Sequence, residues 1–139
     1  MNISLDQEDL SFSILMANYN NSKFIEEAIS SVLSQSYRHW ELIIVDDCST
    51  DKSIEKIKPF LKDKRIRVLR NNTKLGYGGA LKTASKAANN EILAILDPDD
   101  KLHEKALEIM AKAYRENPDY GFIYSTCLLY TSPSPRDRS

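Results

Sequence analysis

Several features that would mark particular classes of protein are scarce or missing in this 139-residue sequence. Its two cysteines, Cys48 and Cys127, lack the C-x-x-C spacing of redox and zinc motifs, so reduced thiols in a cytoplasmic protein are expected. The apolar runs at 42–45 and 92–96 are far too short to span a bilayer, and the acidic N-terminus is unlike a signal peptide. With 19 basic and 20 acidic residues, the chain offers no electrostatic case for nucleic acid or an anionic membrane as its main partner.

What is present is a regular alternation of strand-like and helix-like segments. Strands are predicted at 12–18, 41–46, 65–70, 91–96 and 120–126, and helices from about 22, from about 50, over 79–90 and over 103–116. The strand at 65–70 is polar at alternate positions, as expected at a sheet edge, and Pro59 is expected to kink or shorten the second helix. This alternation predicts βαβ units, and therefore an α/β fold with a mostly parallel sheet and helices on both faces.

Polar and acidic residues follow three of the predicted strands at the points where they end. The residues at 18–20, the pair Asp46 and Asp47, and the turn at 97–100 all occupy such positions. Ligands of open α/β sheets bind at the carboxyl ends of the strands. We therefore expect these three groups to converge on one rim.

The acidic turn places Asp97, Asp99 and Asp100 directly after an apolar strand that the sequence predicts to be buried. Neighbouring carboxylates repel one another, and each is costly to desolvate, so a bound cation would relieve both costs. Mg²⁺ and Mn²⁺ prefer such oxygen ligands. The alternative is that these aspartates are turn and helix-cap residues around Pro98. Three of them in one turn favour the metal site.

Two further groups suggest contacts to a nucleotide. A carboxylate of the Asp46–Asp47 pair would accept a hydrogen bond from a ligand N–H such as uracil N3, whereas residues 49–51 are expected to cap the following helix. Tyr19 offers a ring for stacking on a base, with packing at the sheet edge as the alternative. The loop at 75–82 is glycine-rich but matches no dinucleotide or P-loop motif, and it is predicted to be a flexible turn and helix start that approaches the ligand.

Taken together, these motifs resemble family 2 glycosyltransferases, which are inverting enzymes of the GT-A fold. The matching segments follow one another in family-like order over residues 12–126: 13-SILMANYN-20, 30-SSVLSQSY-37, 41-ELIIVDDCSTD-51, 71-NNTKLG-76 and 91-EILAILDPDD-100. The resemblance implies a Rossmann-like GT-A sheet that binds a nucleotide-diphosphate sugar, most often a UDP-sugar. It also implies metal-assisted transfer of the sugar to an acceptor hydroxyl, as in cell-wall or polysaccharide biosynthesis.

By position in the family pattern, five residues would bind the donor. Ala17, Tyr19 and Asp47 would lie at the base, and Asp97 and Asp99 would lie near the ribose and the sugar. The resemblance further implies that Asp99 or Asp100 binds Mg²⁺ or Mn²⁺ bridging the diphosphate. No residue in this chain matches the family's catalytic base, which is expected downstream in the acceptor-binding half.

The predicted organisation is an N-terminal extension at 1–11, a donor-binding half-domain at 12–126 and a foreign, unstructured tail at 127–139. The tail resembles translated sequencing-adapter read-through, so a truncated chain is expected. The whole protein is expected in the cytoplasm, with peripheral attachment at the inner face of the membrane as an option. Two alternatives stay open: a nucleotide-sugar-binding module without catalysis, and a sugar nucleotidyltransferase. The latter class carries a glycine-rich basic signature after its first strand, where this chain has 17-ANYNNSKF-24.

Overall fold

A single four-stranded sheet organises the molecule, which we describe over residues 10–117 from a computed structural model. Its strands are β1 (Phe12–Asn18), β2 (Trp40–Asp46), β3 (Ile66–Arg70) and β4 (Ile92–Ile95). They lie in the order β3-β2-β1-β4, and every neighbouring pair is parallel. All carboxyl ends therefore lie at one edge of the sheet, and β3 is at one side of it, as the sequence predicts.

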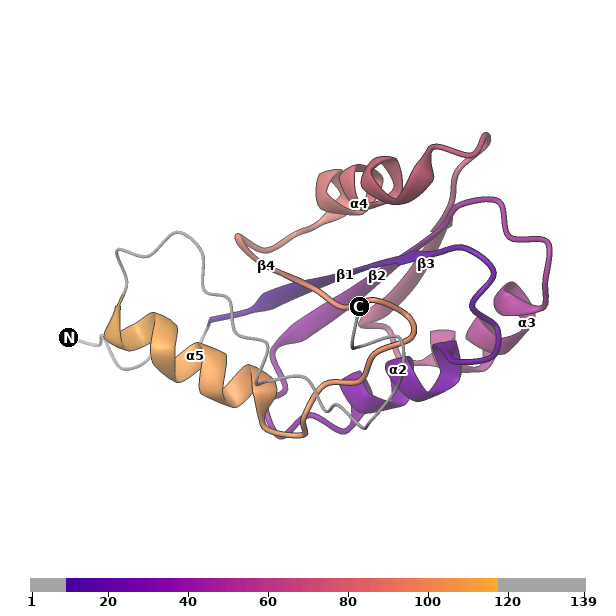
Figure 1. Ribbon diagram of the computed structural model, residues 1–139. Coiled ribbons are helices and arrows are strands. Elements are labelled where there is room, and N and C mark those ends of the chain that lie inside the picture. The colour runs from indigo at the N-terminus through magenta and orange to yellow at the C-terminus, as the bar shows by residue number, and fades with distance from the viewer. Residues whose placement is uncertain (1–9, 118–139) are drawn as a thin grey trace, which may run out of the picture.

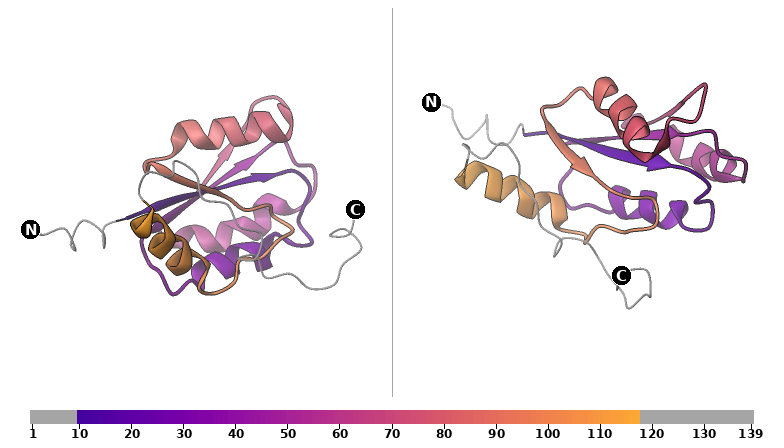
Figure 2. Two further views of the ribbon diagram at one scale, coloured as in Figure 1. Left: turned by 60° about the vertical axis from the view of Figure 1, so that its left-hand side comes forward. Right: turned by 45° about the horizontal axis from the view of Figure 1, so that its top comes forward.

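Helices cover both faces of this sheet. Helix α4 (Gly76–Ala87) lies on one face, whereas α2 (Ile25–Leu33), α3 (Ser53–Ile57) and α5 (Ala106–Glu116) lie on the other (Figure 1). The two turned views in Figure 2 show the same three layers. The α/β prediction, with a parallel sheet between helices, is confirmed.

Alternating side chains of the two central strands fill two separate cores. Phe12, Ile14 and Met16 of β1 pack in the larger core under α2, α3 and α5. Leu15 and Ala17 face the other way and meet small side chains of α4, namely Ala80 and Ala84. Because both faces are covered, β1 is buried along its whole length, as is typical of parallel strands.

Helix α2 follows its sequence pattern closely. Its buried positions, Ile25, Ala28, Ile29 and Val32, recur at helical spacing, and Glu26 and Glu27 lie in the first turn, where the helix dipole favours acidic groups. The prediction of a shortened second helix is also confirmed, because α3 ends at Ile57 and a 3₁₀ turn (Lys58–Lys62) with Pro59 follows it.

Helices α4 and α5 do not begin where the sequence predicts. Helix α4 starts at Gly76, not Gly79, because the Asp47 carboxylate accepts the N–H groups of Leu75 and Gly76 and so stabilises an earlier first turn. The helix ends at Ala87, three residues before the predicted end. The predicted flexible glycine turn is therefore part of this helix.

Helix α5 starts at Ala106 instead of His103 because Gln35, two residues after the end of α2, anchors its first turn. The side-chain amide of Gln35 donates to the carbonyl of His103 and its oxygen accepts the N–H of Leu107. This contact joins residues far apart in sequence, so no local pattern reveals it.

The prediction that the fourth strand is buried is wrong for one of its faces. Leu93 and Ile95 are 40% and 54% exposed, whereas Ile92 and Ala94 pack against the larger core. The reason is that α4 lies over the central strands and packs on β1 and β2.

Some predictions fall outside the described residues: the strand at 120–126, Cys127, the tail, and most of the N-terminal extension. Among the helices of residues 10–117, none combines the length and the apolar character that a bilayer span requires.

Candidate functional site

A cleft of about 450 Å³ opens at the carboxyl edge of the sheet. Its walls come from the ends of β1, β2 and β4 and from the start of α4, as the sequence analysis anticipates for this rim. The lining residues are Ala17, Asn18, Tyr19, Asn21, Asp47, Lys74, Gly76, Tyr77, Ala80, Asp97, Pro98 and Asp99. The strand ends therefore bring residues distant in sequence into one concave site.

A buried polar network fixes the first two strand ends. The Asp46 carboxylate is fully buried and accepts hydrogen bonds from the Asn18 side chain at 2.9 Å and the Ser49 hydroxyl at 2.6 Å. The Ser49 hydroxyl oxygen in turn accepts the backbone N–H of Asn20 at 2.9 Å. Asp46 thus has a structural position behind the cleft, whereas its neighbour Asp47 lines the cleft.

One acceptor in this network has no protein partner among the described residues. The side-chain oxygen of Asn18 is buried in the cleft wall, while its amide nitrogen donates to Asp46 and Ser49. Buried acceptors of this kind are usually paired with water or a ligand. The Asn18 oxygen therefore makes this part of the cleft wall polar.

The loop that carries Tyr19 is tied to the loop after β2. Asn20 adopts a left-handed backbone conformation with φ 55°, which asparagine tolerates better than most residues. Its side-chain oxygen accepts the N–H groups of Thr50 and Asp51, and the Asp51 carboxylate accepts the N–H of Ser22. These bonds hold the Tyr19 loop at the edge of the cleft.

Acid should loosen this connection between the loops. Burial raises the pKa of Asp51, but hydrogen bonds from the Ser53 hydroxyl and from the N–H groups of Ser22 and Ser53 outweigh it and lower the pKa to about 2. A depressed folded-state pKa gives stability that is present above the unfolded value, near 3.8, and lost as the pH falls through about 2. We expect Asp51→Asn to be less stable than the wild type at pH 6 and the difference to be much smaller near pH 2, in urea unfolding measured at both values. A difference that stays constant from pH 6 to pH 2 would contradict this account.

Asp47 lines the cleft and also anchors the start of α4. Its carboxylate is buried and accepts hydrogen bonds from the Asn71 side chain and the N–H of Leu75, both at 2.9 Å, and from the N–H of Gly76 at 2.8 Å. Burial raises its pKa, but these bonds and the nearby Lys74 charge outweigh burial, so the pKa lies below its ordinary value. Oδ2 takes only one of these bonds, which leaves capacity for one ligand N–H.

Tyr19 and Lys74 meet at the mouth of the cleft. The Tyr19 ring is 39% exposed, and the Lys74 ammonium lies 3.5 Å from its centroid in a cation–π contact. Lys74 comes from the segment just before α4, so this contact connects the first strand end to the glycine-rich loop.

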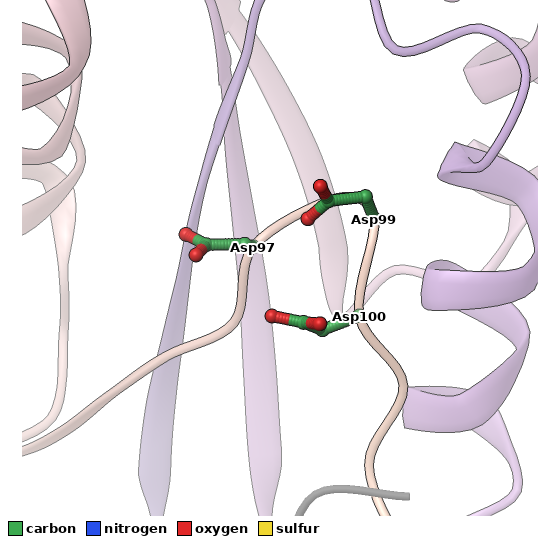
Figure 3. A group of neighbouring side chains, drawn as sticks. All are labelled: Asp97, Asp99 and Asp100. Atoms are coloured by element: carbon green, nitrogen blue, oxygen red, sulfur yellow. The ribbon is translucent and has the colours of Figure 1, made fainter. Parts of the chain in front are cut away.

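The acidic cluster comprises Asp97, Asp99 and Asp100, which lie on the loop after β4 (Figure 3). One carboxylate oxygen from each lies within 4.8 Å of the others, and all three residues are half-buried. Because one small turn holds three oxygens this close together, the geometry and the hard-ligand chemistry fit a divalent cation.

Tyr77 connects this cluster to α4. Its hydroxyl donates a 2.7 Å hydrogen bond to Asp97, although 56% of the residue is exposed. Burial, this hydrogen bond and the charges of the three aspartates raise the pKa of Tyr77 to about 12, so the hydroxyl stays a donor at neutral pH.

All five predicted donor-binding residues, Ala17, Tyr19, Asp47, Asp97 and Asp99, line the cleft, and Asp100 lies in the acidic cluster beside it. Their roles remain predictions. Lys74 and Tyr77 also line the cleft, and neither was predicted as a site residue, although Tyr77 lies in the loop at 75–82 that was expected to approach the ligand. The nearby glycines were the one sequence feature that pointed to this loop. No local pattern shows which residues of the loop face the cleft.

The four-stranded parallel sheet between helices is a GT-A-like α/β fold, and the comparison with known families agrees with it. The model for glycosyl transferase family 2 matches residues 13–131, and the chain belongs to this family.

Among curated relatives, the chain is 38% identical over 117 residues to the E. coli protein WfgD, a UDP-Glc:alpha-D-GlcNAc-diphosphoundecaprenol beta-1,3-glucosyltransferase. It is 34% identical over 105 residues to glycosyltransferase GlyG of Streptococcus pneumoniae. These alignments cover 84% and 75% of this chain but only 46% and 35% of the two relatives, so the chain spans less than half of their length.

Solved structures give the same assignment of fold. The chain matches S. aureus TarS 1-349 in complex with UDP-GlcNAc with a TM-score of 0.74 and 28% sequence identity, over 78% of this chain and 32% of that one. The complex of the same protein with UDP matches with the same TM-score and 27% identity.

Proposed function

We propose that this chain binds a nucleotide-diphosphate sugar, specifically a UDP-sugar, as the donor-binding portion of an inverting glycosyltransferase. The observation that carries the proposal is the convergence of Tyr19, Asp47 and Asp99 in one cleft from three separate strand ends. Each group suits one part of such a donor. The aromatic ring can stack on the base, the carboxylate has an acceptor position for an N–H of the base, and the acidic cluster can hold the cation that accompanies the diphosphate.

The base would occupy the side of the cleft formed by β1 and β2. The exposed Tyr19 ring offers a stacking surface, and Asp47 Oδ2 has capacity for one more hydrogen bond, which the N3–H of uracil would donate. Ala17 adds a small side chain to the same wall and leaves room for a flat ring. The structural neighbour TarS, which was crystallised with UDP and with UDP-GlcNAc, supports a uridine donor.

The diphosphate and the sugar would lie toward β4. Asp97 would contact the ribose and sugar hydroxyls, with one of its oxygens held by Tyr77. We propose that Asp99 holds Mg²⁺ or Mn²⁺, with Asp100 as the second candidate ligand. When bound, the cation would supply positive charge that stabilises the departing nucleoside diphosphate.

The proposed reaction is a single displacement at the sugar's anomeric carbon. An acceptor hydroxyl attacks from the face opposite the leaving nucleoside diphosphate, which inverts the configuration, and its proton passes to a general base. We assign no residue of this chain as that base. The acceptor would be a saccharide or lipid-linked saccharide of the kind used in cell-envelope synthesis, which the name of the E. coli relative supports. For such an acceptor, we propose that the whole protein acts in the cytoplasm, at the inner face of the membrane.

Selectivity for the base tests this proposal. We expect the chain to bind UDP at least about tenfold more tightly than CDP in calorimetric titrations with Mn²⁺, because uracil N3–H donates to Asp47 and cytosine N3 has no hydrogen to donate. Asp47→Asn should remove the preference; its fold is checked by circular dichroism because Asp47 also anchors α4. Equal affinities for UDP and CDP would exclude the assigned role of Asp47, and no binding of either by the folded protein would contradict the proposal.

A further inference from the structure

Lys74 is the one positively charged side chain among the residues that line the cleft in the described part of the chain. Three carboxylates, those of Asp47, Asp97 and Asp99, line the same cleft. Lys74 is exposed, and its ammonium lies over the Tyr19 ring at 3.5 Å. The Lys74 charge helps to lower the pKa of nearby Asp47, but the roles proposed for Asp47 and the acidic cluster give this lysine no contact with the ligand.

The position of Lys74 conflicts with a base stacked on the same face of Tyr19. An ammonium and a nucleobase cannot occupy one face of a ring together, so the lysine must leave when the base arrives on that face. The conflict costs little, because a cation–π contact at an exposed site is weak. The lysine stem has four carbons and rotates freely, so the ammonium can reach other positions in the cleft.

The charges of the cleft indicate where the ammonium would go. A nucleoside diphosphate brings several negative charges into a space lined by carboxylates, and like charges at these distances repel. A cation at the acidic cluster would offset part of that repulsion on the β4 side. On the side of Tyr19 and α4, Lys74 is the one cleft-lining side chain within residues 10–117 that carries positive charge, and an ammonium is a common phosphate ligand.

We propose that Lys74 is a phosphate-binding residue that leaves the Tyr19 ring when nucleotide enters and pairs with the donor's diphosphate. The inference rests on the proposed function and names a further residue for the same site. In the free protein Lys74 covers the stacking surface, and in the complex it neutralises the phosphates. It therefore opposes the binding of a bare nucleoside and favours the binding of a nucleotide.

Opposite effects on two ligands test this exchange. The chain is titrated with uridine and with UDP by NMR at constant Mg²⁺, as wild type and as Lys74→Met, which keeps an unbranched stem of four heavy atoms and removes the charged ammonium. We expect Lys74→Met to bind UDP about tenfold more weakly, and to bind uridine equally well or up to about threefold more tightly because nothing competes for the ring. Added salt should weaken UDP binding less in this variant than in the wild type.

Two controls separate charge from position. Lys74→Arg keeps the positive charge and should retain most of the affinity for UDP. Lys82→Met removes the same charge from an exposed position of α4 outside the cleft lining and should bind UDP as the wild type does. Circular dichroism confirms that each variant is folded.

The possible results are distinct. Equal weakening of uridine and UDP by Lys74→Met would show that the lysine only positions Tyr19, and unchanged UDP affinity would show that it does not contact phosphate; either overturns the inference and leaves the proposed function intact. A folded wild type that binds neither ligand would overturn the proposed function and this inference with it.

Discussion

Asp99→Asn is expected to bind UDP on the order of 100-fold more weakly than the wild type when Mn²⁺ is present. The reason is that Asp99 lines the cleft within the acidic cluster and is the residue we assign to the cation, so an amide in its place removes charge and one hard ligand. Without added metal, wild type and variant should bind UDP equally weakly. Calorimetric titration of both proteins with and without Mn²⁺ measures the effect.

The same experiment distinguishes the aspartates of the cluster. If Asp99 coordinates the cation directly, Asp100→Asn should weaken UDP binding less than Asp99→Asn does. If Asp100→Asn weakens it more, Asp100 is the metal ligand instead. Glu91→Gln is the matched control, because it removes an exposed carboxylate just before β4, at the end of the strand away from the acidic cluster. An Asp99→Asn protein with wild-type, metal-dependent affinity would contradict the assignment of the cation to this residue.

Asp46→Ala is expected to lower the free energy of unfolding by roughly 3 kcal/mol. The Asp46 carboxylate is fully buried, and without it the donors on Asn18 and Ser49 lose their shared acceptor. The exposed Arg70, whose Nε lies 3.9 Å from the carboxylate, would lose a weaker partner. Urea unfolding followed by the fluorescence of Trp40, the single tryptophan of the chain, measures the loss.

A graded series gives this prediction its control. Ser49→Ala removes one hydroxyl from the network and should cost about 1 kcal/mol, clearly less than Asp46→Ala. Glu91→Gln, at an exposed position, should change stability by less than about 0.5 kcal/mol. If Asp46→Ala were no less stable than Glu91→Gln, the network would not hold the two strand ends and another cause for the position of Tyr19 would be needed.

The fold and the place of the site could be predicted because the signals for both are local. Apolar residues run without interruption over 14–17 in β1 and 42–45 in β2, as is typical of buried parallel strands, and acidic residues lie at the ends of β2 and β4. Parallel strands end at one edge, so topology alone brings Tyr19, Asp47 and Asp99 to the same cleft.

What the sequence could not show depends on contacts between distant residues. Glycines destabilise helix interiors, so the sequence pattern predicts a start of α4 at Gly79. Asp47, directly after β2, instead stabilises a start at Gly76, whose φ of 84° suits glycine. A methyl group at Gly79 would lie 2.5 Å from the Leu75 side chain, so only glycine fits this turn. The contacts of Lys74 with Tyr19 likewise depend on how α4 docks on the sheet.

The most direct test of the central claim, that this cleft is a nucleotide-sugar donor site, is to map UDP binding by NMR on the isotope-labelled chain with Mg²⁺. The account predicts shifts for the amides of Tyr19, Asp47, Gly76 and Asp99, which line the cleft. It predicts little change for Val32 and Ala111, which lie in the core beneath the opposite face. Shifts confined to surfaces outside the cleft, or none with the folded protein saturated in UDP, would contradict it.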